Sequence, residues 1–247
     1  MTVEGVGVKA SEQWFSEHMQ QPLSMTRWGH YGTPVLVFPT AGGDAEEIER
    51  HHLVDACGHL LAAGRVKIYS CDSVAGRALA ARDGTPEHRM WLLNRYQQAV
   101  AHEVVPAIHA DLGGPQPIVV AGASIGAFNA VSMVCRYPEL FAAALGMSGT
   151  YRLQPLLEDH FGDDLYFASA VHFVAGLDGP QLDLLRQRRV ILASGEGAWE
   201  NIGESRAVAD VLGAKGVPNR VDSWGPDVEH DWPTWRRMLP QYLEELC

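Results

Sequence analysis

The sequence has no long apolar run. Its longest continuous apolar stretches, such as residues 35–38 and 141–145, are far shorter than the roughly 20 residues that a membrane span requires. Residues 1–15 contain neither the apolar core nor the basic lead-in of a secretory signal peptide. We therefore expect a protein that has no membrane partner and is located in the cytoplasm.

Cysteine is scarce, and its spacing forms no metal or disulfide pattern. The four cysteines are widely spread, with no CxxC pair and no His/Cys cluster at zinc spacing. Such isolated thiols are typical of buried or incidental cysteines in a reducing compartment. The adjacent His51 and His52 would point about 100° apart on a helix, which makes it hard for them to share one ion. The sequence thus predicts no metal site.

Positive charge is also in short supply. The chain has 19 Lys+Arg against 30 Asp+Glu, a formal net charge of −11. A nucleic-acid partner requires a basic surface that neutralises phosphates, so we expect none. The same charge disfavours highly anionic small molecules. A net charge of this size is compatible with a homo-oligomer.

What is present is a regular alternation of apolar strands with helices. Short apolar runs recur as "PVLVFP", "RVKIYSC", "PIVVAG", "AAALGMSG" and "RVILASG", and helical patterns separate most of them. Mostly continuous apolar strands are buried on both faces, which is typical of a parallel sheet covered by helices. The N-terminal segment, including "PLSMTRWGHYG", is expected to add antiparallel edge strands. We predict one α/β domain over residues 1–247.

The helical patterns define five main helices and one irregular segment. Helices are expected over residues 44–64, 86–114, 124–137, 204–215 and 233–246. Asp44 and Glu47 would cap the first of these, and Gly64 would end it. Residues 150–188 are rich in loops and fit the alternation poorly. We predict that they form an insertion that shapes a substrate pocket.

One strand-to-helix junction carries a G-x-S-x-G pattern, Gly122-Ala123-Ser124-Ile125-Gly126. The strand before it and the helix after it are the setting of a nucleophile elbow. In so tight a turn a Cβ at either glycine would meet neighbouring backbone, and the serine would be strained. We predict that Ser124 is a nucleophile and that the Ile125 N–H stabilises an oxyanion. The alternative is a glycine-rich turn without chemistry.

A nucleophilic serine needs a general base, because its hydroxyl is protonated at neutral pH. His230 follows the strand pattern "NRVDSW" and precedes the last helix, so it lies at the carboxyl end of a strand. Five other histidines fall within helical patterns, where packed or solvated roles are the ordinary interpretation. We therefore predict His230 as the base.

An acid that orients the base should follow the strand "RVILASG" and precede His230. The candidates are Glu196 and Glu200 in "GEGAWENIGES", and we favour Glu200 with Glu196 as the alternative. The tryptophans nearby, among them Trp199 and Trp232, could line an acyl or aryl pocket, whereas Trp235 on the last helix is expected to pack in the core.

These pieces resemble an α/β-hydrolase, and more narrowly the esterase family that includes S-formylglutathione hydrolases, feruloyl and enterochelin esterases and mycolyltransferases. The resemblance runs from about residue 34 to the end, and is carried by "VLVFPTAGGDAEE", "GASIGAFNAVSMVCRYPELF", "ILASGEGAWE" and "HDWPTWRRMLP". It implies that the Ala41 N–H is the second oxyanion donor, with Thr40 beside the substrate. It also implies that Glu200 takes the place of the family's more usual Asp, while the "HG" of the oxyanion loop is missing.

The sequence therefore predicts a serine esterase that acts on a small-molecule ester through a Ser124–His230–Glu200 triad, without a cofactor. Three alternatives stay open. The same triad could transfer the acyl group to an alcohol or amine, or it could act as a thioesterase or peptidase. The third alternative is a non-catalytic binding protein of the same fold.

Overall fold

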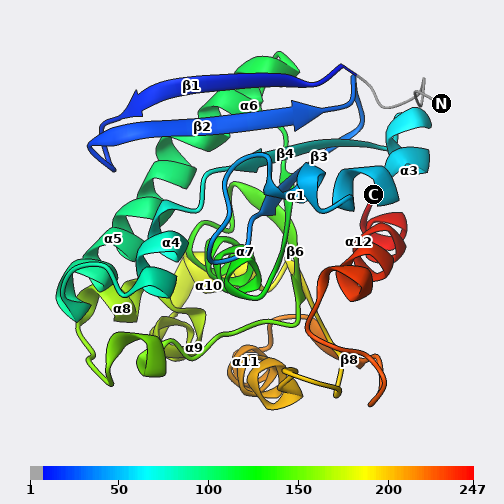
Figure 1. Ribbon diagram of the computed structural model, residues 1–247. Coiled ribbons are helices and arrows are strands. Elements are labelled where there is room, and N and C mark those ends of the chain that lie inside the picture. Colours follow the sequence, from blue (N-terminus) through cyan, green and yellow to red (C-terminus); the bar gives the residue numbers. More distant parts are fainter. Residues whose placement is uncertain (1–7) are drawn as a thin grey trace.

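The computed structural model describes residues 8–247 and is built on an eight-stranded sheet (Figure 1). The strands run in the order β1-β2-β4-β3-β5-β6-β7-β8. They are β1 (Ala10–Ser16), β2 (Gln21–Trp28), β3 (Thr33–Phe38), β4 (Val66–Cys71), β5 (Ile118–Ala123), β6 (Phe141–Met147), β7 (Arg189–Ser194) and β8 (Asn219–Ser223). β2 is antiparallel to both of its neighbours, β1 and β4, whereas strands β3 to β8 are parallel to one another. This confirms the predicted α/β-hydrolase architecture with antiparallel N-terminal edge strands.

Alternate side chains of the central strands feed two separate cores. In β3, Leu36 and Phe38 belong to one buried cluster, and Val35 and Val37 belong to the other. This is the expected consequence of side chains that point to opposite faces of a strand. Since both faces are covered by helices, the strands need apolar residues at every position, as the continuous runs in the sequence indicated.

The helices divide between the two faces (Figure 1). One face is covered by α4 (Val74–Ala81), α5 (Pro86–Ala99), a π-helical turn η1 (Val100–Val104), α6 (Val105–Leu112), α7 (Ile125–Arg136), α8 (Asp163–Ala168), α9 (Ala170–Phe173), α10 (Gly179–Leu185) and α11 (Ile202–Ala214). The other face is covered by α1 (Glu47–Arg50), α2 (Leu53–Ala56), α3 (Gly58–Ala62) and α12 (Trp232–Leu246).

The prediction of one helix over residues 44–64 is wrong. The segment forms the three short helices α1, α2 and α3, and His52 between the first two has a left-handed backbone with φ 61°. Glu47 does not cap a helix, because its carboxylate binds Thr40 on the preceding turn. Gly64 ends the segment with φ 63°, as expected.

Residues 86–112 are helical throughout, as predicted. Thr85 caps the start by accepting a hydrogen bond from the His88 N–H at 3.2 Å. The helix contains Pro106, which lacks an N–H donor, and the π-helical turn η1 directly precedes its segment. Residues 150–188 form short helices, including the 3₁₀ turns η2 (Gln154–Leu157) and η3 (Val174–Gly176).

Within residues 8–247, no helix combines the length and the apolar character that crossing a bilayer would take.

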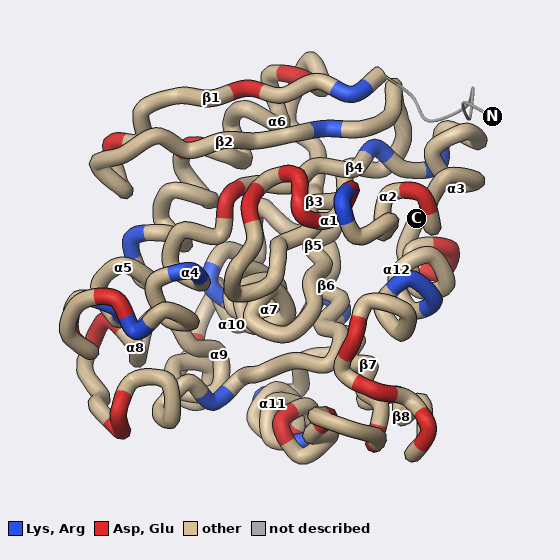
Figure 2. The backbone as a smooth tube through the Cα atoms, in the orientation of Figure 1, with Lys and Arg blue, Asp and Glu red and all other residues tan. Residues whose placement is uncertain are grey.

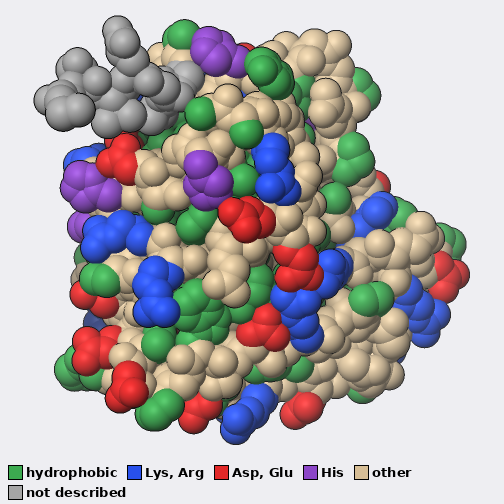
Figure 3. Space-filling view, turned by 90° about the vertical axis from the view of Figure 1, so that its right-hand side faces the viewer, with side chains coloured by type: hydrophobic (Ala, Val, Ile, Leu, Met, Phe, Trp, Pro, Cys, Tyr) green, Lys and Arg blue, Asp and Glu red, His purple; other side chains and the backbone are tan. Residues whose placement is uncertain are grey.

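On the side of α12, acidic, basic and histidine side chains are interspersed (Figure 3). Several of them form ion pairs, such as Arg220 with Glu245 at 2.5 Å. Such exposed pairs contribute little to stability.

Candidate active site

Ser124 lies at the sharp turn between β5 and α7. Its backbone angles are φ 57° and ψ −120°, a strained conformation for a residue with a side chain. Such strain costs on the order of 1–3 kcal/mol and is typical of functional sites. The Ser124 N–H donates to the Met147 carbonyl at 3.0 Å, and the Thr150 N–H donates to the Ser124 carbonyl at 3.3 Å. These bonds fix the turn against the end of β6.

The two glycines of the motif allow backbones to approach that a side chain would separate. A Cβ on Gly122 would lie 2.3 Å from the Gly126 carbonyl carbon. A Cβ on Gly126 would lie 2.5 Å from the Phe38 carbonyl oxygen and 2.7 Å from that of Pro39. The start of α7 is thereby pressed against the end of β3. This contact brings the Ile125 N–H, which has no acceptor within the helix, towards the turn that follows β3.

That turn, residues 40–43, is fixed by hydrogen bonds to a buried carboxylate. Glu47 is 6% exposed, and its two oxygens accept the Thr40 N–H and the Thr40 hydroxyl, each at 2.7 Å. The Gly43 N–H closes the turn on the Thr40 carbonyl at 3.1 Å. Ala41, predicted as the second oxyanion donor, occupies the second position of this turn.

The same turn is held from the side by α4. Arg77 donates to the Gly43 carbonyl at 2.8 Å. A Cβ on Gly76 would lie 3.0 Å from the Ala41 carbonyl oxygen, so the helix backbone packs closely against the turn. We call residues 40–43, Glu47, α4 and the start of α7 at Gly126 the oxyanion wall, after the role predicted for it.

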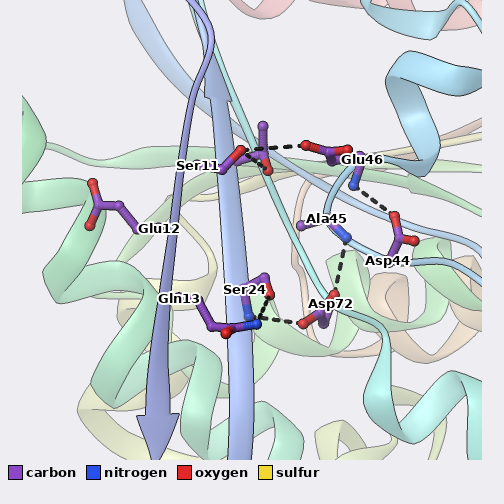
Figure 4. Close-up of a pocket in the computed structure, with 9 residues that line it drawn as sticks. Ser11, Glu12, Gln13, Ser24, Asp44, Ala45, Glu46 and Asp72 are labelled. Atoms are coloured by element: carbon purple, nitrogen blue, oxygen red, sulfur yellow. Dashed lines mark hydrogen bonds between the residues drawn. The ribbon is translucent and has the colours of Figure 1, made fainter.

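Behind the oxyanion wall lies an acidic cavity of about 430 Å³ (Figure 4). Its lining includes Asp44, Ala45 and Asp72, and it contains none of the residues predicted to be catalytic. Asp72 accepts the Ser24 N–H at 2.9 Å and the Ala45 N–H at 3.3 Å. These bonds tie the segment after the oxyanion turn to β2, which is a structural role.

His230 lies on a loop that is joined by backbone contacts to the loop after β7. The His230 N–H donates to the Ala198 carbonyl at 3.1 Å, and the Gly197 N–H donates to the Val228 carbonyl at 2.9 Å. A Cβ on Gly195 would lie 2.1 Å from the Val228 carbonyl oxygen. The two loops therefore position His230 as one unit.

Glu200 lies beside His230 and is held by two serine hydroxyls. Its Oε2 is 4.0 Å from His230 Nδ1, and its side chain is 1% exposed. Ser148 Oγ donates to Glu200 Oε1 at 2.5 Å, and Ser194 Oγ donates to Oε2 at 3.0 Å. The Trp235 indole N–H donates to Ser148 Oγ at 2.9 Å. We call Glu200, Ser148, Ser194 and Trp235, with His230, the acid–histidine wall.

Ser124 and the serine that binds Glu200 follow neighbouring strands. Ala123 at the end of β5 pairs with Met147 at the end of β6, so Ser124 and Ser148 follow neighbouring strands. Burial lowers the pKa of His230, and the charges of Glu200 and Asp231 partly offset this effect. A lowered pKa keeps the imidazole neutral, which is the state that accepts a proton at neutral pH.

The remaining predicted site residues lie in different surroundings. Glu196 is exposed and accepts a hydrogen bond from Ser223 Oγ at 2.5 Å. Trp199 is 92% exposed, with φ 63°. The Trp232 ring stacks on His51, with centroids 4.0 Å apart and planes 2° from parallel. Trp235 packs in the core, as predicted.

Sequence reasoning missed the residues that support the site. Ser148 and Ser194 each lie at the carboxyl end of a strand, which is the same positional signal that led to Ser124 and the acid. Applied to every polar residue at that sheet edge, the signal would have placed both serines near the site, but not their bonds to Glu200. Glu47 had no such signal, because it lies in a segment that reads as a helix.

Comparison with known proteins defines the class. The solved structures that match include a ferulic acid esterase, at 17% identity and TM-score 0.73, with 97% of each chain covered. They also include an S-formylglutathione hydrolase from Agrobacterium tumefaciens, at 13% identity and TM-score 0.72, covering 99% of this chain and 96% of that one. A fluorophosphonate-binding serine hydrolase from Staphylococcus aureus matches at 13% identity and TM-score 0.67, covering 98% and 99%. No curated protein matches the chain.

The fold is that of α/β-hydrolase esterases. The model of the family described as "Putative esterase" matches residues 64–246, and the chain belongs to that family. The family's description is that of enzymes that act on ester bonds.

Proposed function

We propose that the protein hydrolyses a small, uncharged carboxylic ester through an acyl-enzyme on Ser124, with His230 as general base and Glu200 as the acid that orients it. The observation that carries the proposal is the strained backbone of Ser124 at the start of α7. The acid–histidine wall supports it, because Glu200 and His230 lie on loops that follow strands of the same sheet edge.

In the first step, Ser124 Oγ attacks the ester carbonyl carbon while His230 takes the hydroxyl proton. The oxyanion that forms is bound by the N–H groups of Ile125 and Ala41. The C–O bond to the alcohol then breaks, and the proton on His230 passes to the leaving oxygen. The products of this step are the free alcohol and an acyl group on Ser124.

In the second step, His230 removes a proton from water, and the water oxygen attacks the acyl carbonyl. The tetrahedral species collapses, the carboxylic acid leaves, and the proton returns to Ser124. The negative charge of Glu200 stabilises the imidazolium in both steps. No step requires a cofactor.

The charge around the site favours an uncharged ester. Figure 2 shows acidic residues before α1 and between β8 and α12. The second group is Asp227, Glu229 and Asp231, which surround His230 in the sequence. Such a rim repels an anionic substrate.

Two tryptophans complete the proposed substrate contacts, and Thr40 supports them indirectly. The exposed indole of Trp199 and the partly buried indole of Trp232 offer surface to an apolar acyl or aryl group. Thr40 shapes the oxyanion turn and does not donate to the substrate, because Glu47 already accepts both its N–H and its hydroxyl.

The test is hydrolysis of p-nitrophenyl butyrate by the wild type and by Ser124→Ala, with butyric acid and nitrophenol both measured. We expect equal amounts of acid and nitrophenol from the wild type, and a loss of kcat on the order of 10⁶-fold in the variant. Mono-p-nitrophenyl succinate, which carries a carboxylate, should react with a lower kcat/KM. Undiminished turnover by Ser124→Ala would contradict the proposal.

A further inference from the structure

The Glu200 carboxylate has both of its oxygens occupied by hydroxyl groups. Ser148 Oγ donates to Oε1 at 2.5 Å and Ser194 Oγ donates to Oε2 at 3.0 Å. His230 Nδ1 lies 4.0 Å from Oε2, beyond hydrogen-bond distance. The serines, and not the imidazole, therefore make the hydrogen bonds that fix the position of this buried carboxylate.

The separation of Glu200 and His230 is set by backbone contacts. The loops that carry them are joined at His230 to Ala198 and at Gly197 to Val228. Neither loop can shift far towards the other, because Gly197 already has no room for a Cβ against the Val228 carbonyl oxygen, at 2.7 Å. A closer approach of acid and base must come from the Glu200 side chain itself.

Of the two serines, Ser148 restrains the Glu200 side chain more strongly. Its oxygen accepts the Trp235 indole N–H at 2.9 Å, so its single proton is directed to Glu200. Ser194 also has one proton, which lies between two acceptors: the Gly195 carbonyl at 2.9 Å and Glu200 Oε2. A shared proton makes the weaker bond.

We propose that Ser148 and Ser194 are positioning residues that hold the Glu200 carboxylate back from His230 and thereby limit how strongly the acid stabilises the imidazolium. The inference rests on the proposed triad. It gives the two serines a role opposite to simple support, because removing either hydroxyl removes one of the bonds that hold the carboxylate away from the imidazole.

The charges that act on His230 are few. Glu200 from the loop after β7 and Asp231 from its own loop both raise its pKa, and burial lowers it by more. From α12 it meets the uncharged ring of Trp235, at 5.2 Å between centroids. With Asp231 unchanged, a stronger pull from Glu200 must appear as a higher pKa of His230.

The first readout is the pH dependence of kcat/KM for the wild type, Ser148→Ala and Ser194→Ala. We expect the midpoint of the acid limb to rise by about half a pH unit or more in each serine variant. Ser223→Ala is the matched control, since Ser223 makes the same 2.5 Å bond to Glu196, which does not face His230. That variant should leave the midpoint unchanged.

The second readout does not require activity. In Ser124→Ala, the titration of His230 is followed by NMR, with its signal assigned by its loss in His230→Gln. Adding Ser194→Ala should raise the midpoint of this titration, but not when Glu200→Gln is also present, because the serine acts through the acid. Ser194→Ala also provides the test if Ser148→Ala does not fold.

The outcomes separate the two proposals. A higher His230 midpoint that depends on Glu200 supports the inference, whether or not the ester is hydrolysed. An unchanged midpoint means that the hydroxyls only fill space, and a lower one means that they hold Glu200 in place for His230; either overturns it. Failure of the proposed function would instead appear as a wild type without esterase activity.

Discussion

The two walls beside Ser124 are held in different ways. In the oxyanion wall, glycines at positions 76 and 126 let backbones pack directly on the ends of β3 and the turn after it. In the acid–histidine wall, hydroxyl and indole groups determine where the Glu200 carboxylate lies. The first wall has little freedom to adjust, whereas the second depends on side-chain hydrogen bonds that substitutions can alter in steps.

This difference matches what each wall is proposed to do. Oxyanion donors must be in place before charge develops, so a fixed backbone suits them. The strength of a base must instead match the working pH, and hydrogen bonds to a neighbouring acid can tune it. The following variants test that division, from the largest expected effect to the smallest.

The largest effect is expected from Gly126→Ala. The new methyl group would lie 2.5 Å from the Phe38 carbonyl oxygen, so α7 must move away from β3 and the Ile125 N–H must move with it. We expect activity close to background and a loss of stability of about 1–3 kcal/mol. Gly42→Ala is the control in the same wall, because nothing lies within 4 Å of its Cβ. Equal, mild effects of both variants would contradict the steric account.

Glu47→Gln should have an intermediate effect. The amide offers one acceptor where the carboxylate offers two, and its NH₂ would face a donor on Thr40. We expect kcat to fall by about 10- to 100-fold with little change in KM, because the oxyanion turn loses its support. Steady-state kinetics would test this, with the more exposed Glu46→Gln as control. A change confined to KM would place Glu47 in substrate binding instead.

The pH profile should show a smaller effect. Since burial lowers the pKa of His230, the acid limb of kcat/KM should have its midpoint below the ordinary value of 6.5. Activity is then lost as pH falls through this lowered value rather than through 6.5. Asp231→Asn removes a charge that raises this pKa, so its midpoint should be lower still, while the exposed Asp227→Asn serves as control. A wild-type midpoint above 6.5 would contradict the account.

Trp199→Ala should have the smallest effect. With 92% of its surface exposed, the side chain contributes little to packing. The free energy of unfolding, measured by thermal denaturation, should change by no more than about 0.5 kcal/mol. If the indole contacts the substrate, KM for an apolar ester should rise a few-fold and KM for an acetyl ester should change less. If the variant has the same KM as the wild type for each of the two esters, Trp199 does not contact the substrate.

The sequence was informative where residues close along the chain determine the structure. The continuous apolar runs predicted β3 to β7, and the glycine spacing around Ser124 predicted the tight approach of Gly122 to Gly126. The helix expected over residues 44–64 is instead interrupted at His52, whose backbone is left-handed, and at Cys57. The apolar periodicity continues across both interruptions and therefore does not reveal them.

The hydrogen bonds of the supporting side chains could not be predicted, because their partners lie far away in the sequence. Ser148 bonds to an acid 52 positions later in the chain, and to Trp235, 87 positions later. Nothing in the run "AAALGMSG" distinguishes this serine from one that ends a strand without a partner. Trp235 was expected in the core, and it does pack there, but its N–H also orients a hydroxyl.

The central claim is that Ser124 is an activated nucleophile, and a fluorophosphonate probe with intact-mass detection tests it most directly. We expect one adduct on the wild type, no adduct on Ser124→Ala, and slower labelling of His230→Ala, because the base activates the serine. An adduct that persists in Ser124→Ala, or no adduct on folded wild type, would contradict the claim.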